Sequence, residues 1–394
     1  MYINTMYSPD FGGGAEVTLK TQVEAVKKLG HEVVVLATSS KPGINEDLVN
    51  GVRVIRVGLK NIYWPNGYKS PSRFEKGIWH LRDVYNIEMK SLASQVIERE
   101  SPSVISLHNL VGWSESIWGL LPSLEIPALQ VLHDMYNLCP GSLMFKGDNS
   151  CKKRCFSCRT LRLLSPRLSN NVSGVVGVSK FILEKHIENG YFSAVNSRNF
   201  IHNTRNMDKE LLSNVMPYRG PTRFGFIGTL APSKGIEFLL KSFQKSFNGA
   251  ELWVAGEGRP EYVEYLRENY SNVAKFCGHI KPFDFYPNIS ALIVPSLSEE
   301  ALGMVVPEAF AFGLPVVGSL RGGIPEMINH NVNGLLFDPD VDGSLEDCVS
   351  KLINDSQLLL NLGEAARKAA NPYLDTEAWA KKYIKIFSEI SGHE

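Results

Sequence analysis

Two glutamates that are eight positions apart could bind a ligand with many hydroxyl groups. Glu300 and Glu308 lie in the stretch 296–328, around the start of an expected helix. Carboxylates accept hydrogen bonds from pairs of hydroxyl groups, so the two side chains could reach different parts of an extended ligand, such as a sugar and a ribose. A general acid/base pair is the competing interpretation, and two solvated glutamates favoured by the helix dipole are the ordinary structural one.

Two glycine-containing turns could receive a phosphate. Gly12, Gly13 and Gly14 follow an expected first strand and precede a helix, whose free N–H groups could bind a phosphate or a polar sugar. In the stretch 228–240, Lys234 would place an ammonium group beside a helix N-terminus, which suits a leaving diphosphate. The alternatives are a tight turn without a ligand and a solvated surface lysine.

Four of the six cysteines gather in one stretch. Four thiolates could close a tetrahedral structural zinc site that staples a long loop. Thiols without a metal in a polar loop are the alternative, because the interval of eleven residues after the first cysteine is unusual for common zinc modules. An iron–sulfur cluster is a third reading. The cysteines are Cys139, Cys151, Cys155 and Cys158.

The same stretch is locally basic, with no acidic residue between positions 151 and 167. Apolar residues are interleaved with the basic ones, which favours transient contact with anionic lipid headgroups or with a lipid-linked diphosphate acceptor. An ordinary solvated face is the alternative. The basic residues are Lys152, Lys153, Arg154, Arg159, Arg162 and Arg167.

The elements that must position these residues form two series. Short β-rich apolar runs alternate with longer helical patterns from INTMY to GVVGVS and again from RFGFIGT to GLLFD. This alternation is typical of βαβ units that build a parallel sheet. Because 394 residues exceed what one core usually organises, we expect two doubly wound α/β domains. An amphipathic helix is expected from about 376 to 390.

The composition of the chain argues against nucleic-acid binding and against a transmembrane protein. The 41 basic side chains balance 41 acidic ones, so the chain lacks the net field that holds a nucleic acid. The start has no basic segment followed by a long apolar one, and the most apolar stretch, 111–132, is interrupted by polar residues and prolines. We therefore expect no nucleic-acid partner, no transmembrane helix and a cytoplasmic location.

The stretch 300–326 resembles the donor-binding signature of family 4 of the glycosyltransferases. The resemblance extends over nearly the whole chain, including the opening glycine turn and the AGEG motif from Ala255. The matching residues are Glu300, Glu308, Gly313, Pro315, Gly322, Gly323, Pro325 and Glu326.

The resemblance implies the GT-B fold, in which two Rossmann-like domains face each other across a cleft. It implies an acceptor-binding domain at 1–202, with the cysteine-rich basic loop at 139–167 inserted in it. A nucleotide-sugar-binding domain would follow at 203–373, and the helix at 374–394 would cross back to the first domain.

The resemblance also implies roles for single residues. Glu308 would hold the ribose hydroxyls, and Lys234 would neutralise the diphosphate. Glu300 would bind the donor sugar together with the Gly322-Gly323 loop, and His133 would face that sugar, although a lone strand-end histidine is more often structural. The expected catalytic residues are His133, Lys234 and Glu300. The expected donor-binding residues are Gly13, Gly14, Gly228, Thr229, Lys234, Gly278, Ile280, Glu300, Gly303, Met304, Val305, Glu308, Gly322 and Gly323.

One position departs from the family pattern. Thr229 stands where many relatives have an arginine that joins the lysine on the diphosphate. Arg321 or Arg259 could supply the missing charge.

The expected reaction is the transfer of a hexose from a nucleotide-diphosphate sugar, with retention of configuration, to a glycan or a lipid-linked acceptor in cell-surface polysaccharide synthesis. No carboxylate is placed as a nucleophile, so we expect attack on the face that the diphosphate leaves, without a metal ion or another cofactor in catalysis. The alternatives are a nucleotide-sugar epimerase or hydrolase of the same fold and a non-catalytic nucleotide-sugar-binding protein. The basic loop adds the inner face of the cytoplasmic membrane as an expected location.

Overall fold

The computed structural model forms two compact units, each described here by itself. The first unit comprises residues 1–144, 152–204 and 376–394, and the second comprises residues 145–151 and 205–375. Gly12 of the expected glycine turn lies outside the described residues. The residues that the structure describes are 1–10, 13–65, 71–147, 149–213, 218, 220–247 and 249–392.

The first unit is built on an eight-stranded sheet that is parallel except at one edge. Its central strands are apolar and buried, as expected for a parallel sheet covered on both faces. At the edge, β3 pairs antiparallel with β4, and its polar, exposed sequence INEDLV was not predicted to be a strand. In sheet order the strands are β10 (Ser197–Phe200), β9 (Gly174–Gly177), β6 (Ala128–Leu132), β5 (Ile105–Leu107), β1 (Tyr2–Asn4), β2 (Val34–Ser39), β4 (Val52–Gly58) and β3 (Ile44–Val49).

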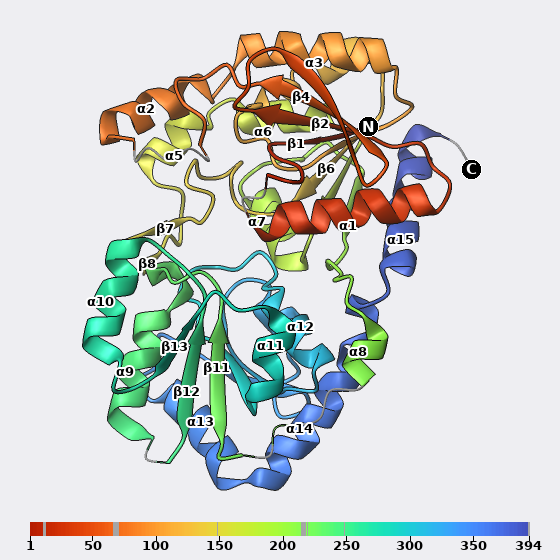
Figure 1. Ribbon diagram of the computed structural model, residues 1–394. Coiled ribbons are helices and arrows are strands. Elements are labelled where there is room, and N and C mark those ends of the chain that lie inside the picture. The colour runs from red at the N-terminus through yellow and green to blue at the C-terminus, as the bar shows by residue number, and fades with distance from the viewer. Residues whose placement is uncertain are drawn as a thin grey trace. The chain divides into compact units, whose positions relative to one another are not determined.

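Helices cover this sheet, and α1 and α3 lie on opposite sides of it in Figure 1. α1 buries Leu19 and Val23 in a core cluster with Val35 of β2. The helix expected near the end of the chain is α15, whose Phe387 meets the ring of Tyr2 edge-on at 6.3 Å between centroids. The helices are α1 (Gly14–Lys28), α2 (Arg73–Arg82), α3 (Ile87–Glu100), α4 (Leu121–Leu124), α5 (Phe156–Leu161), α6 (Ser165–Leu168), α7 (Lys180–Glu188) and α15 (Thr376–Ser391).

The second unit is built on a six-stranded sheet in which every recorded pairing is parallel. A short hairpin of β7 and β8 also belongs to this unit. In sheet order the strands are β13 (Lys275–Gly278), β12 (Glu251–Ala255), β11 (Arg223–Ile227), β14 (Ala291–Val294), β15 (Val316–Ser319) and β16 (Gly334–Phe337), and the hairpin consists of β7 (Phe145–Lys146) and β8 (Asn149–Ser150).

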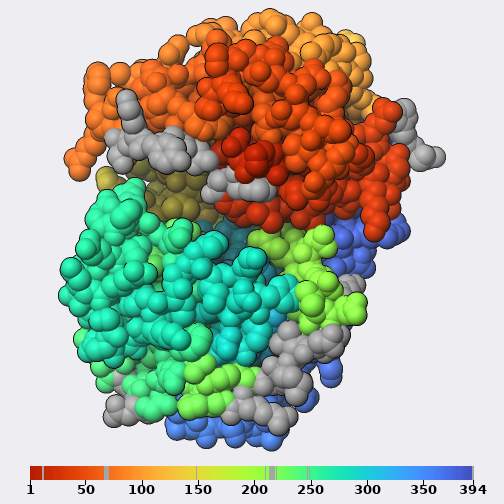
Figure 2. All heavy atoms as spheres, viewed as in Figure 1, coloured from red at the N-terminus to blue at the C-terminus, as the bar shows by residue number. Residues whose placement is uncertain are grey.

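The helices of the second unit pack on this sheet, with α9 and α10 together along one side of it (Figure 1). In the space-filling view, the teal residues of α10 and α11 form much of the visible surface of this unit (Figure 2). The core beneath combines Leu239 and Leu240 of α9 with Phe224 of β11. The helices are α8 (Lys209–Ser213), α9 (Ile236–Ser246), α10 (Pro260–Tyr270), α11 (Pro282–Phe285), α12 (Val305–Ala311), α13 (Ser344–Asn354) and α14 (Ser356–Ala369).

In each sheet, the direction in which successive strands are added changes beside one strand, β1 in the first unit and β11 in the second. β1 lies between β5 and β2, and β11 lies between β12 and β14. In open α/β sheets, ligands bind outside the carboxyl ends of the strands at such a switch point. Gly13 and Gly14 follow β1, Lys234 follows β11, and Glu300 follows β14.

Candidate active site

An ion pair between Lys234 and Glu300 forms the centre of the candidate site in the second unit. The Lys234 Nζ lies 2.6 Å from the Glu300 Oε1, and the Ser296 hydroxyl donates to the same oxygen at 2.7 Å. The pair forms because β11 and β14 are neighbours, so the segments that follow them meet at the same edge of the sheet. No partner of the second oxygen, Glu300 Oε2, is recorded among the described residues. A carboxylate held this way keeps one oxygen available for a ligand hydroxyl.

Close backbone contact holds the two segments together. The amides of Leu297 and Ser298 donate to the carbonyl of Ser233 at 3.0 and 2.9 Å. Gly235 has a φ of 70°, and a Cβ there would lie 1.8 Å from the Pro295 carbonyl oxygen. Only glycine fits this position, because any side chain would separate the segments that carry Lys234 and Glu300.

Electrostatics keep Glu300 ionised. Burial opposes the charge of its carboxylate, but the ammonium of Lys234 and the hydroxyl of Ser296 outweigh that effect, so the pKa of Glu300 lies below its ordinary value. The Lys234 side chain is 34% exposed and the Glu300 side chain 13% exposed, so the cation is the more accessible partner. An incoming anion could therefore reach the Lys234 ammonium, whereas the Glu300 carboxylate is more deeply buried.

The Gly322-Gly323 loop wraps around the backbone of Glu300. The amide of Gly322 donates to the Glu299 carboxylate at 2.5 Å, and the amide of Gly323 donates to the Glu300 carbonyl at 2.8 Å. Gly322 has a φ of 58°, and a Cβ there would lie 2.0 Å from the Glu300 carbonyl oxygen. The structure therefore brings Lys234, Glu300, Gly322 and Gly323 together.

Glu308, in the first turn of α12, contacts two residues that were not predicted from the sequence. The Nε of Arg205 lies 2.5 Å from Glu308 Oε1, and the Tyr286 hydroxyl lies 3.3 Å from Glu308 Oε2. Arg205 is anchored by its amide, which donates to the Tyr373 carbonyl at 2.8 Å. Each carboxylate oxygen has two lone-pair directions, so each can still accept one hydroxyl group. No local sequence signal marks Arg205, which is 103 positions from its partner.

The other expected donor-binding residues of the second unit also lie at the carboxyl ends of strands or at a helix start. Gly228 and the exposed Thr229 follow β11, Gly278 ends β13 and Ile280 follows it, and Gly303, Met304 and Val305 lead into α12. The amide of Gly256 donates to the Gly278 carbonyl at 2.8 Å.

The two arginines considered as substitutes at Thr229 differ in their surroundings. Arg321 pairs with Asp340 at 2.6 Å and lies 3.9 Å from Asp338. Arg259 is exposed at the N-cap of α10. Arg205 is a third arginine that could supply the positive charge missing at Thr229. It already contacts Glu308, which is an expected donor-binding residue.

Three expected residues belong to the first unit. Gly13 caps α1 and Gly14 begins it. His133 directly follows β6, and its Nε2 lies 2.8 Å from the Nδ1 of His108, which follows the neighbouring strand β5. Burial lowers the pKa of His133 to about 4 and also lowers that of His108, so both rings are neutral at pH 7. His108 was not predicted as a site residue.

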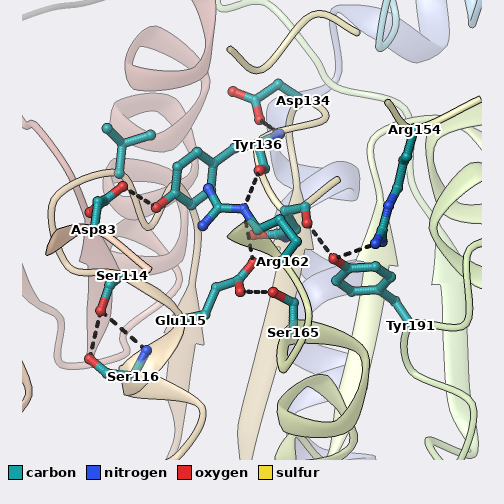
Figure 3. Close-up of polar contacts among 12 residues, drawn as sticks. Asp83, Ser114, Glu115, Ser116, Asp134, Tyr136, Arg154, Arg162, Ser165 and Tyr191 are labelled. Carbon is teal, nitrogen blue, oxygen red and sulfur yellow. Dashed lines mark hydrogen bonds and ion pairs between the residues drawn. The ribbon is translucent and has the colours of Figure 1, made fainter. Parts of the chain in front are cut away.

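A buried polar network fixes the segment after His133 (Figure 3). The guanidinium of Arg162 stacks 4.3 Å from the ring centre of Tyr136, and its Nε donates to the Tyr136 carbonyl at 3.2 Å. The Tyr136 hydroxyl donates to Asp83, and the Arg162 Nε lies 3.7 Å from Glu115. The amide of Tyr136 in turn donates to Asp134 at 2.7 Å. Arg162 is 1% exposed, so its assignment to a basic surface face was wrong.

Two carboxyl groups of this network resist ionisation. Burial raises the pKa of Asp83 to about 7, although the Tyr136 hydroxyl and Arg162 oppose the shift. Burial likewise raises the pKa of Glu115 to about 7 against the effects of Arg162 and Ser165. Both folded-state values exceed the ordinary values of 3.8 and 4.5, so the folded chain holds these protons more tightly than the unfolded chain does.

As the pH rises from about 4 to about 7, Asp83 and Glu115 should contribute less and less to the free energy of unfolding of the first unit. The buried His108 and His133, whose pKa values are lowered, act in the opposite direction. At the two carboxyl groups the folded state binds more protons than the unfolded state in this window, so their contribution to stability is full at low pH and is lost as the pH passes the folded pKa values. Each pKa unit corresponds to about 1.4 kcal/mol. Denaturant unfolding followed by tryptophan fluorescence at several pH values measures the slope of the free energy of unfolding against pH. Asp83→Asn should lose less stability than the parent as the pH rises through this window.

Glu88→Gln is the matched control, because Glu88 lies on α3 of the same unit in an exposed pair with Arg82. It should leave the pH slope at the parental value. Equal slopes for Asp83→Asn and the parent would show that Asp83 ionises normally in the folded state.

The structure does not support the predicted zinc site. The thiols of Cys155 and Cys158 approach to 3.4 Å, and Cys139 interacts with Cys158. Cys151 belongs to the second unit, where the hydroxyl of its neighbour Ser150 donates to the Leu297 carbonyl at 3.0 Å. Within the described ranges, no group of three or more His, Cys, Asp or Glu side chains could hold a metal ion. Three of the four thiols thus interact with one another, but they do not form a group that could hold a metal ion in the described part of the chain.

Comparisons with known proteins agree with this architecture. The model of the glycosyl transferase 4-like domain matches residues 13–198, and the model of glycosyl transferases group 1 matches residues 210–369. An uncharacterized 42.6 kDa protein in the cps region of Klebsiella pneumoniae is 26% identical over 363 residues, which cover 89% of this chain and 95% of that protein.

Solved structures show the fold. Sucrose-phosphate synthase from Thermosynechococcus elongatus superposes with a TM-score of 0.76 at 17% identity, over 99% of each chain. The Anabaena protein HepE in complex with UDP gives a TM-score of 0.71 at 17% identity, over 98% of this chain and 99% of HepE. These matches show the GT-B fold, and the two family models together span most of the sequence. The chain therefore belongs to the GT-B glycosyltransferases of the family 4 type, with a glycosyl transferase 4-like domain followed by a domain of the glycosyl transferases group 1.

Proposed function

We propose that the protein transfers a hexose from a nucleoside-diphosphate sugar to a glycan or lipid-linked acceptor, with retention of configuration, in cell-surface polysaccharide synthesis. The observation that carries this proposal is the Lys234–Glu300 pair at the switch point of the second sheet. A cation beside a carboxylate with one available oxygen suits a ligand that is an anion at one end and a polyol at the other. The second unit would bind the donor, and the first would bind the acceptor.

Each group would meet a different part of the donor. The Lys234 ammonium would neutralise the diphosphate, and the Glu300 Oε2 would accept hydroxyl groups of the hexose. Glu308, oriented by Arg205 and Tyr286, would accept the two ribose hydroxyls. UDP in complex with HepE, a protein of the same fold, supports a nucleoside diphosphate as part of the donor.

Retention would follow from attack on the face that the diphosphate leaves. Lys234 would stabilise the charge that grows on the diphosphate as the glycosidic bond breaks. The departing phosphate oxygen would accept the proton of the attacking hydroxyl, so no residue would have to act as a covalent nucleophile. The cps-region relative from Klebsiella pneumoniae supports a role in polysaccharide synthesis.

A screen of nucleotide sugars by thermal shift tests the proposal, followed by transfer assays with the donor that stabilises the protein most. Nuclear magnetic resonance of the product should show the anomeric configuration of the donor. Inversion of configuration would contradict the same-face mechanism. Release of free sugar without transfer to any acceptor would indicate a hydrolase, and an altered nucleotide sugar would indicate an epimerase.

The first unit also carries a basic surface with exposed apolar residues. Lys152, Lys153 and Arg159 are exposed, and Phe156 and Leu163 are 83% and 76% exposed. Basic groups with protruding apolar side chains favour an anionic bilayer surface, which would place the protein at the inner face of the cytoplasmic membrane. Among the described residues, no helix is both long and apolar enough to cross a membrane.

Changing Lys152, Lys153 and Arg159 to glutamine should weaken binding to vesicles that contain phosphatidylserine. Each base near an anionic surface contributes about 1 kcal/mol, so the loss should be on the order of 100-fold at low salt. Arg154 is left unchanged because its guanidinium lies 3.3 Å from the Tyr191 hydroxyl. Vesicle flotation at two salt concentrations measures the effect.

The matched control changes Lys381, Lys382 and Lys385 to glutamine, which removes the same charge from α15 of the same unit. This control should bind vesicles as the parent does. Equal loss in both triple variants would mean that net charge, and not this surface, governs binding.

A further inference from the structure

Three side chains form a continuous hydrogen-bonded chain at the carboxyl ends of β5 and β6. The Ser106 Oγ lies 2.9 Å from the His108 Nε2, and the His108 Nδ1 lies 2.8 Å from the His133 Nε2. The chain forms because β5 and β6 are paired neighbours, so residues at their ends meet. Ser106 and His108 are 1% and 3% exposed, whereas His133 is partly exposed. The chain therefore runs from the interior of the first unit toward an accessible ring.

The Ser106 hydroxyl determines which group donates each hydrogen bond. A hydroxyl group buried in a protein needs an acceptor for its proton. Among the described residues, the only recorded partner of the Ser106 Oγ is the His108 Nε2. Ser106 therefore donates to His108, and Nε2 of His108 carries no proton.

A neutral imidazole carries one proton, so the proton of His108 lies on Nδ1. That N–H donates to the Nε2 of His133, which in turn places the proton of His133 on its Nδ1. The opposite direction would leave the Ser106 hydroxyl proton buried without an acceptor, which is the costlier arrangement. Burial lowers the pKa of both rings, which agrees with their neutral state at pH 7.

We propose that Ser106 and His108 are positioning residues that hold His133 in the Nδ1–H tautomer, so that His133 offers an N–H donor to a hydroxyl oxygen of the transferred sugar. The sugar-facing role of His133 rests on the function proposed above, whereas the tautomer does not. A ring in this form has no lone pair on the offered nitrogen, so it cannot take the proton of the attacking hydroxyl. The proton must then go to the departing diphosphate, which is the base in the same-face mechanism.

Two-bond ¹⁵N–¹H correlation spectra of the full chain with ¹⁵N-labelled histidine test the tautomer directly. His108→Gln and His133→Gln assign the two rings among the nine histidines. At pH 7, both rings of the parent should show the pattern of the Nδ1–H tautomer. A His133 ring protonated on Nε2 would overturn the proposal, whatever the enzyme transfers.

Two serine variants test the cause. Ser106→Ala removes the donor to His108, so the Nε2–H form of His133 should become populated, whereas Ser106→Thr keeps a hydroxyl and should keep the parental spectrum. Unchanged tautomers in Ser106→Ala would show that the serine does not set them. If Ser106→Ala does not fold, Ser106→Cys, whose thiol is a weaker donor, should shift the tautomers in the same direction.

Kinetics separate positioning from a merely structural role. Ser106→Ala should lower kcat by about tenfold, the size expected for one misdirected hydrogen bond, with little change in the affinity for the nucleoside diphosphate. Ser106→Thr should restore kcat. If Ser106→Ala has altered tautomers but a parental kcat, Ser106 and His108 do not have the positioning role proposed here. If the parent protein shows the expected tautomers but transfers no sugar in any assay, the proposed function is wrong.

Discussion

Replacing Lys234 with alanine should lower kcat for sugar transfer by about 100-fold or more, as for other removed groups that stabilise developing charge. The ammonium of Lys234, in the segment that follows β11, lies beside Glu300, where it would face the diphosphate. Its attraction grows as the glycosidic bond breaks and charge builds on the leaving group, so its loss acts on the transition state more than on the bound donor. Steady-state kinetics with the identified donor measure the change.

The substitution also removes the counterion of a partly buried carboxylate, and this effect must be separated from catalysis. Without the cation, burial should raise the pKa of Glu300 and weaken the local structure. The double variant with Lys234→Ala and Glu300→Gln removes the unpaired charge, so it should recover stability in thermal unfolding without recovering kcat.

Lys241→Ala is the matched control for Lys234→Ala. Lys241 is exposed on α9 of the same unit, where it pairs with the half-buried Glu237, and its loss should leave kcat unchanged. A parental kcat in Lys234→Ala would remove this lysine from the mechanism and direct attention to Arg205, Arg259 and Arg321 as partners of the diphosphate.

Glu308→Gln should raise the donor KM by roughly 10- to 100-fold while kcat changes little. Hydrogen bonds to a charged acceptor contribute about 1.5–3 kcal/mol, and a ribose contact exists in both the bound donor and the transition state. The neutral amide also loses its ion pair with Arg205 and cannot accept through both end atoms. Binding of the nucleoside diphosphate, measured by calorimetry, should weaken in parallel.

Arg205 offers a graded companion test. Arg205→Gln keeps Glu308 but removes the cation that orients it, so the donor KM should rise less than in Glu308→Gln. Glu251→Gln is the control, because Glu251 pairs with Arg223 at 2.7 Å at the opposite, amino-terminal ends of β11 and β12. Unchanged nucleotide affinity in Glu308→Gln would place the ribose elsewhere.

The sequence determined the elements and the kinds of residue that the candidate site uses. Apolar runs bounded by glycines and helical patterns predicted two α/β domains, because a strand covered on both faces needs apolar residues throughout. The positions of Lys234 and Glu300 after strands were also visible, since a parallel strand must end before its crossover helix begins. β3 was not predicted, because an edge strand that is exposed on both faces has no alternating apolar pattern.

Which of these residues meet depends on the tertiary structure. Lys234 and Glu300 are 66 positions apart, and Arg205 and Glu308 are 103 apart. Their contacts depend on the order of strands in the sheet, which residue spacing along the chain does not encode. The same limit applies to Arg162, which was grouped with the basic surface residues expected to contact anionic lipid and is instead buried against Tyr136 and Glu115. The local sequence pattern indicates what chemistry a residue could perform. The order of strands and the burial of a residue determine its partners. The partners in turn determine its protonation state and the ligand that it can bind.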